Sequence, residues 1–179
     1  MKHLAKLHAE ATAALAEIVR LEEKSGRLQL EEKEIIAAGN IEDPAIFKQV
    51  SDIRLMLDLI PRKTAQNLQF AEAVSAQIVE EIAKTKHRVF EIWQRIHRET
   101  QAKLKKALEP FALEASGPTD SLIEQLTAQT AAVTKAQHLE NAVHAAHGNA
   151  RFDAPVETVL KQARYVIEAF AAFTGEKAA

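Results

Sequence analysis

The 179-residue chain contains no cysteine, which excludes disulfide bonds, thiolate metal ligands and cysteine nucleophiles. It has only five glycines and five prolines, so few positions suit tight turns. No apolar run approaches the roughly 18 residues of a membrane-spanning helix, and we expect no membrane association. These absences point to a protein made of long, uninterrupted elements.

An excess of charge of one sign is also missing. The 23 Lys and Arg residues nearly balance 25 Asp and Glu, giving a net charge of −2, whereas nucleic-acid-binding domains are usually strongly basic. The composition favours helix, and no segment alternates apolar and polar residues as a strand would. We therefore predict an all-α fold. Because the segment from Met1 to Leu4 does not open a secretion-signal core, we expect a cytoplasmic protein.

One segment, residues 44–109, predicts a single helix interrupted only at Pro61. Asp43 is a good N-cap, and Pro44 suits the first helical position. At ~1.5 Å per residue this helix would be roughly 100 Å long, so we predict an elongated fold with the other helices alongside. We expect a bend near Pro61, because the proline ring clashes with a carbonyl of the preceding turn. Its apolar stripe comprises Ile46, Val50, Ile53, Leu57, Ile60, Leu68, Ala71, Val74, Ile78, Ile82, Val89, Trp93, Ile96, Leu104 and Leu108.

A first helix over residues 2–38 carries apolar residues at heptad spacing. Ser25–Gly26 could split it, but no Glu or Gln stands at the capping-box position, so a continuous, bent helix is the better prediction. Only residues 39–43 connect this helix to the long one. The two helices therefore form an antiparallel hairpin, in a register that places Ile35 beside Phe47.

The longest irregular stretch, residues 110–118, precedes two further predicted helices. One runs from residue 119 or 120 to about 146, and the other over about 153–175. We expect both to pack against the end of the long helix. The predicted organisation is an antiparallel two-helix hairpin at 1–80 that shares one long kinked helix with a C-terminal three-helix bundle at 81–179.

The hairpin leaves apolar side chains without a partner. Residues 53–60 place them on nearly every side of the long helix, and the first helix covers only one side. We predict that Leu55, Leu59 and Phe70 form a patch that is buried by self-association, most simply in a four-helix dimer of hairpins. This favours a structural, assembly or adaptor protein that acts through coiled-coil contacts, with a second copy or another protein as partner.

Basic residues are concentrated between positions 84 and 106. Helical spacing places five of them on one outward stripe, where Lys and Arg could neutralise phosphates. The alternative interpretation is thus a nucleic-acid-associated helical protein. A solvated charged face is the simpler interpretation, because the rest of the chain is acidic. The stripe consists of Lys84, Arg88, Arg95, Arg98 and Lys105.

Motifs for catalysis are missing from the sequence. There is no Gly-x-Ser-x-Gly elbow and no glycine loop that could bind phosphate, so we predict no enzyme and no cofactor. Glu140, His144 and His147 share one helical face, but a metal needs three or four ligands with outer-shell support. We interpret them as surface residues rather than a metal site. Trp93 lies on the apolar stripe, which favours a core anchor of the C-terminal bundle over an aromatic recognition site.

Overall fold

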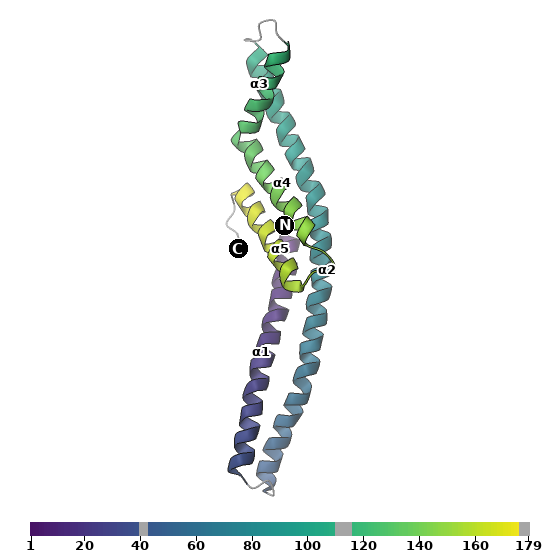
Figure 1. Cartoon of the computed structure of the whole chain (residues 1–179), viewed down its shortest axis with the longest axis vertical. Helices are drawn as coiled ribbons and strands as arrows, with labels where there is room; N and C mark the ends of the chain where they lie inside the picture. The colour runs from purple at the N-terminus through teal and green to yellow at the C-terminus, as the bar shows by residue number, and fades with distance from the viewer. Residues whose placement is uncertain (40–42, 110–115, 176–179) are drawn as a thin grey trace. The chain divides into compact units, whose positions relative to one another are not determined.

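The computed structural model describes residues 1–39, 43–109 and 116–175, which form α-helices and no strand within these ranges (Figure 1). The predicted all-α fold is confirmed. The helices are α1 (Lys2–Ala38), α2 (Pro44–Leu108), α3 (Ser116–Gln129), α4 (Ala131–Asn149) and α5 (Val156–Thr174).

The first two helices begin and continue as predicted. α1 is unbroken through Ser25–Gly26. α2 begins at Pro44, and the backbone N–H of Ala45 donates a hydrogen bond to Oδ1 of Asp43 at 2.8 Å, which confirms the N-cap. Pro61 lies inside α2 with its ring exposed. The bend expected there stays a prediction.

The chain packs as two compact units. The hairpin unit comprises residues 9–75, that is, most of α1 and the first part of α2. The bundle unit comprises residues 1–8 and 76–179, and so contains the start of α1, the second part of α2, and α3 to α5. The predicted domains, 1–80 and 81–179, imply that each part folds and functions independently. This stays a prediction.

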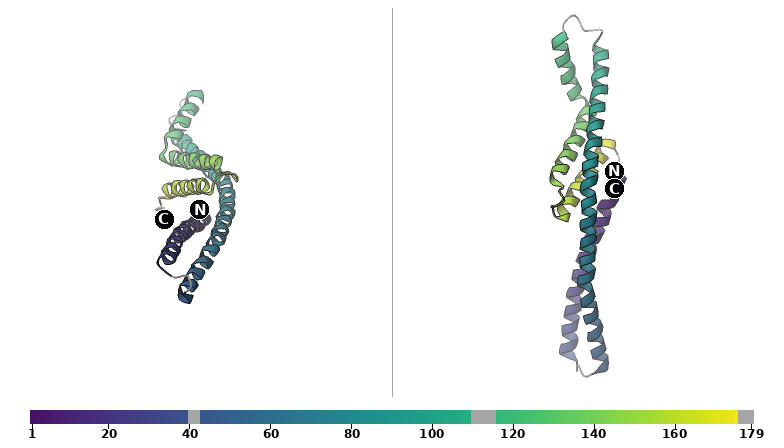
Figure 2. Two further views of the ribbon diagram at one scale, coloured as in Figure 1. Left: turned by 60° about the horizontal axis from the view of Figure 1, so that its bottom comes forward. Right: turned by 90° about the vertical axis from the view of Figure 1, so that its right-hand side faces the viewer.

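In the hairpin unit, α1 and α2 lie side by side in every view (Figures 1 and 2) and enclose a narrow core. Its members, Leu21, Leu28, Ile53 and Ile60, follow the predicted register to within about one residue. They are packed against Ile35 and Leu57.

The predicted pairing next to the turn is wrong. Phe47 is 61% exposed, so it does not face Ile35. Its neighbour Ile46 points at Gly39 instead, where an added Cβ would lie only 2.6 Å from Cδ1 of Ile46. The absence of a side chain at Gly39 is therefore what lets the two helix ends approach each other.

The bundle unit has the thicker core. α3 and α4 follow one another end to end beside the second part of α2, and α5 packs on α4 (Figures 1 and 2). The buried residues of α4 and α5 recur at steps of three and four, as expected for helices that bury one face. α5 ends at Gly175, whose φ of 76° lies in the left-handed region that glycine adopts most easily. The fully buried large side chains of this unit include Leu4, Ile78, Ile82, Val89, Leu139, Val143, Val159 and Val166.

The single helix predicted from residue 119 or 120 to 146 is in fact two helices. The helix is interrupted at Thr130, whose backbone is extended at φ −69° and ψ 131°. The hydroxyls of Thr127 and Thr130 donate hydrogen bonds to carbonyls four residues back, at 2.7 and 3.0 Å. Threonines that bond in this way bend helices. A cluster of them therefore explains a break that the apolar pattern does not indicate.

Some residues assigned to the apolar stripes are exposed. On α3, Leu122 and Leu126 are exposed, whereas Ile123 and Thr127 are buried. Because of the break at Thr130, α3 does not have to continue the buried face of α4. On α2, Leu68 is also exposed.

Candidate functional site

Large apolar side chains that remain exposed are concentrated in the hairpin unit. Of the thirteen such residues in the described part of the chain, eight belong to this unit, although it is the smaller one. Folded monomers seldom leave clustered apolar surface uncovered without a function for it. The hairpin unit is therefore the first place to look for an interaction surface. The eight are Val19, Leu30, Phe47, Leu55, Met56, Leu59, Leu68 and Phe70.

The three predicted interface residues are all exposed in the single chain. Leu55, Leu59 and Phe70 have exposed fractions of 60%, 43% and 49%. Leu55 and Leu59 are one helical turn apart, and Phe70 lies about three turns further along the same side of α2. A second protein surface could therefore cover them without any rearrangement of the hairpin.

Met56 belongs to the same surface, although the sequence analysis did not assign it there. It is 39% exposed and lies one turn before Leu59 on α2. The spacing of three residues between Met56 and Leu59 was the available signal. It was hidden because nearly every residue from 53 to 60 is apolar.

The other side of α2 is polar and fixed by an ion pair. Nε of Arg54 donates to Oε1 of Glu32 on α1 at 2.6 Å, and the Glu32 side chain is only 20% exposed. Helical geometry places Arg54 about 140° around α2 from Leu59. The hairpin thus has one side linked by a short ion pair between its helices and one apolar side that the described residues of the chain leave exposed. We call the second side, with Leu55, Met56, Leu59 and Phe70, the apolar flank.

The predicted basic stripe lies in the bundle unit, and all five of its side chains are exposed. Carboxylates interrupt it. Nζ of Lys84 is 3.8 Å from Oε2 of Glu80. Glu91 is exposed and, by helical spacing, lies in the middle of the stripe. Carboxylates also lie opposite the end of the stripe that contains Arg98 and Lys105.

A cavity of about 420 Å³ between α2 and α3 is lined by Arg98 and Lys105 on one side and by Asp120 and Glu124 on the other. These carboxylates reduce the positive potential that a phosphate backbone would meet. The structure therefore leaves the stripe accessible but partly neutralised along its length.

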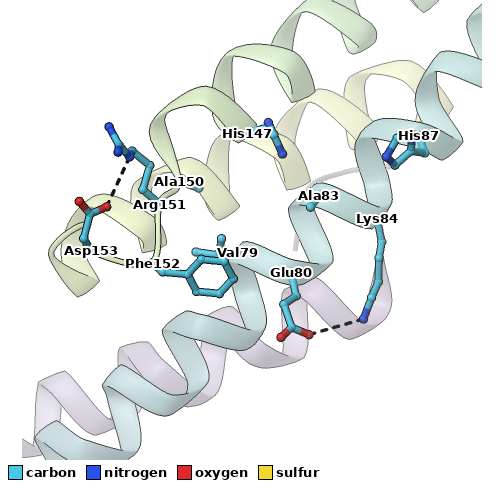
Figure 3. Close-up of a pocket in the computed structure, with 10 residues that line it drawn as sticks. All are labelled: Val79, Glu80, Ala83, Lys84, His87, His147, Ala150, Arg151, Phe152 and Asp153. Atoms are coloured by element: carbon cyan, nitrogen blue, oxygen red, sulfur yellow. Dashed lines mark ion pairs between the residues drawn. The ribbon is translucent and has the colours of Figure 1, made fainter.

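A cavity of about 740 Å³ lies between α2, the end of α4 and the turn after it (Figure 3). Its charged side chains are already paired: Glu80 with Lys84, and Arg151 with Asp153 at 3.4 Å from Nε to Oδ1. Phe152 forms part of its wall and is largely exposed. Solvent-exposed ion pairs of this kind contribute little energy, and they do not form a catalytic arrangement.

The histidines near this cavity have positive surroundings. Partial burial, followed by the nearby Lys86, His144 and His87, lowers the pKa of His147. Such a setting opposes a metal cation. Within the described ranges, no group of three or more His, Asp or Glu side chains could hold a metal ion, and this includes Glu140, His144 and His147.

Trp93 is partly buried, and its role as a core anchor of the C-terminal bundle stays a prediction. Its ring contacts Phe90, at 6.0 Å between centroids, and His97, at 5.4 Å. Its Nε1 is buried and has no hydrogen-bond partner in the described part of the protein. The core is thinner here than one turn earlier, where Val89 is 1% exposed.

The described helices include none that combines the length and the apolar character needed to cross a membrane. No protein-family model, curated protein or solved structure matches the chain. The function has to be argued from the surfaces of the protein itself.

Proposed function

We propose that the protein is a structural or assembly component that acts through helical protein–protein contacts, and that its first interaction is self-association of the hairpin unit. The observation that carries this proposal is the apolar flank of α2. Its side chains are exposed in a unit whose own core is a single narrow seam between two helices. A two-fold pairing of hairpins would bury the same surface on both copies and leave no exposed end.

Burial of the apolar flank supplies part of the free energy that a dimer needs. Full burial of a large apolar side chain contributes ~1.5–3 kcal/mol, and the residues of the apolar flank are already about half covered, so each would contribute roughly 1 kcal/mol. With four such residues on each copy, the total of about 8 kcal/mol is comparable to the ~4–15 kcal/mol entropic cost of association. A micromolar Kd needs about 8 kcal/mol net of this cost, so further contacts along the paired helices have to supply the difference.

The nucleic-acid alternative is less well supported. The stripe contains Glu91, one of its lysines is close to Glu80, and Asp120 and Glu124 lie opposite its far end. A cytoplasmic location and an additional protein partner belong to the same proposal as the self-association. An adaptor could present the bundle unit to that partner while the hairpin unit assembles.

The proposal is tested by the mass of the full chain in solution at tens of micromolar. We expect a mass that is clearly above the 19.8 kDa of one chain and approaches twice that value, measured by light scattering or sedimentation. Leu55→Glu combined with Leu59→Glu should shift the protein to monomer, because the two carboxylates would be buried in the interface between the two copies.

The chain offers a matched control in α3. Leu122 and Leu126 have the same spacing as Leu55 and Leu59 and are also exposed, but they lie in the bundle unit. Leu122→Glu with Leu126→Glu should leave the mass unchanged. A wild-type monomer, or equal effects of the two double variants, would contradict self-association through the hairpin unit.

A further inference from the structure

Three residues of the apolar flank, Met56, Leu59 and Phe70, belong to a longer seam that has heptad spacing, and Leu55 lies beside it. On α2, exposed residues recur at alternating steps of four and three, and they lie about 100° around the helix from the core residues that face α1. This second seam comprises Ala45, Gln49, Asp52, Met56, Leu59, Lys63, Gln66 and Phe70. A helix with two heptad seams can contact two partner helices, and α1 is only one of them.

The order of residues along the seam is symmetric about its apolar centre. Met56 and Leu59 lie at the middle. The next residues outwards are Asp52 in one direction and Lys63 in the other. Gln49 and Gln66 follow, and the seam ends at the small Ala45 on one side and the large Phe70 on the other.

We infer that two copies of the chain pair through this seam with their α2 helices antiparallel, a geometry that rests on the proposed self-association. In antiparallel coiled coils a residue of one copy faces the symmetry-related position of the other. Met56 then packs on the second copy's Leu59, and Asp52 meets the second copy's Lys63. Two-fold symmetry repeats each pair. The outer pairs are Gln49 with Gln66, and Ala45 with Phe70, where the small side chain leaves room for the aromatic ring.

Charge selects this orientation over the parallel one. In a parallel pairing, Asp52 would face Asp52 and Lys63 would face Lys63, and like charges opposite each other destabilise a helical interface. Within the described ranges, neither Asp52 nor Lys63 forms an ion pair in the single chain. Both charges are therefore available to the partner. The pairing also matches residues by size and polarity, because apolar meets apolar at the centre and amide meets amide further out.

Cysteine cross-linking of the full-length protein tests the orientation directly, because the chain has no cysteine of its own. Asp52→Cys and Lys63→Cys are made separately and mixed. Mild oxidation should give a disulfide-linked dimer in the mixture and little in either variant alone. In the antiparallel pairing, the two copies of position 52 are separated by about 11 residues along the helix axis, or roughly 16 Å, which is too far for a disulfide.

Asp58 provides the matched control. It is exposed and lies on α2, but on the side away from the seam. Asp58→Cys should not cross-link with Lys63→Cys. An efficient disulfide in Asp52→Cys alone would show a parallel pairing and overturn this inference while leaving self-association intact. A dimeric mass with no cross-link in any combination would also overturn it. A monomeric mass would reject the proposed self-association itself.

Charge exchange gives a second readout that introduces no cysteine. Asp52→Lys alone and Lys63→Asp alone should each weaken dimerisation about tenfold, because each places two pairs of like charges in the seam. The double variant restores opposite charges across the antiparallel seam and should bind within about threefold of wild type. Failure of the double variant to recover affinity, with its helix content unchanged, would contradict the pairing of Asp52 with Lys63.

Discussion

The bundle unit and the hairpin unit share the helix α2 but cover it to different extents. In the bundle unit the chain supplies several helices near α2, and Ile78, Ile82 and Val89 are almost completely buried. In the hairpin unit α1 is the main partner, and the core is one seam that includes Leu28 and Ile53. The apolar residues of α2 extend over more than one side in both units.

This difference shows where other helices of the same chain bury the apolar residues of α2 and where they leave them exposed. A helix with one neighbour can bury one stripe, and any further apolar residues stay in water unless another molecule covers them. The bundle unit is expected to be stable within one chain. The hairpin unit is expected to gain stability from a second chain.

The largest effect should come from a cavity in the bundle core. Leu139 is 1% exposed, and Leu139→Ala should lower the free energy of unfolding by about 2–5 kcal/mol. The loss should not depend on protein concentration if the bundle core is complete in one chain. Urea unfolding at two protein concentrations measures both points. A loss below about 1 kcal/mol would mean that this core is not closely packed.

The single tryptophan tests the edge of the same core. Because Trp93 is partly exposed, Trp93→Ala should cost somewhat less than the ~3–5 kcal/mol expected for a fully buried Trp. Trp93→Phe should be nearly neutral, since it keeps most of the ring contacts and removes a buried N–H that has no partner. Chemical denaturation followed by circular dichroism gives both values. A large loss for Trp93→Phe would show that the N–H does bond to something.

A smaller effect concerns pH and the bundle unit. Burial, and then the nearby guanidinium of Arg164, lower the pKa of His8 from its usual 6.5. The folded protein therefore favours neutral His8, while the unfolded chain takes up a proton at higher pH. Stability is complete above about pH 6.5 and falls as the pH drops through the lower folded pKa.

Substitution of His8 separates its contribution to the pH dependence of stability from the contributions of other groups. His8→Gln should flatten the dependence of unfolding free energy on pH between 7 and 5, and His147→Gln should flatten it as well, because the pKa of His147 is also lowered. A steeper dependence in His8→Gln would mean that the sign is wrong. Titration of the histidine ring signals by NMR would show the direction of each shift independently.

The weakest effect expected is binding to nucleic acid through the basic stripe. Mixed DNA or RNA should show little binding even at low salt, because Glu91 and the carboxylates near Lys84 and Lys105 oppose it. Tight binding that falls steeply with added salt would support the alternative function. In that case, reversing the charges of Arg88, Arg95 and Arg98 should abolish it.

Most of the fold follows from local chemistry that is visible in the sequence. The Asp43 cap, Pro44 and the glycine that follows α5 each act within a single turn, so the helix ends near them could be predicted. The break at Thr130 could not, because it depends on threonine hydroxyls that bond to their own helix and leave the apolar spacing intact. A periodic pattern alone does not show this competition.

The candidate site was only partly predictable for a different reason. Leu55, Leu59 and Phe70 could be found because they are apolar residues off the main stripe. Met56 and the charges of Asp52 and Lys63 gained meaning only when the structure showed which side of α2 faces α1. Tertiary cover decides which apolar residue is core and which is surface, and the same limit explains the exposed leucines of α3.

If a second chain completes the hairpin unit, the mass of the protein must depend on its concentration, because a reversible dimer dissociates on dilution. Sedimentation equilibrium of the wild-type protein from about 1 to 100 micromolar measures this dependence. We expect a rise from near 19.8 kDa towards twice that value, with the Leu55→Glu and Leu59→Glu variant remaining at the lower mass throughout. A wild-type mass that stays at one chain over the whole range would contradict it.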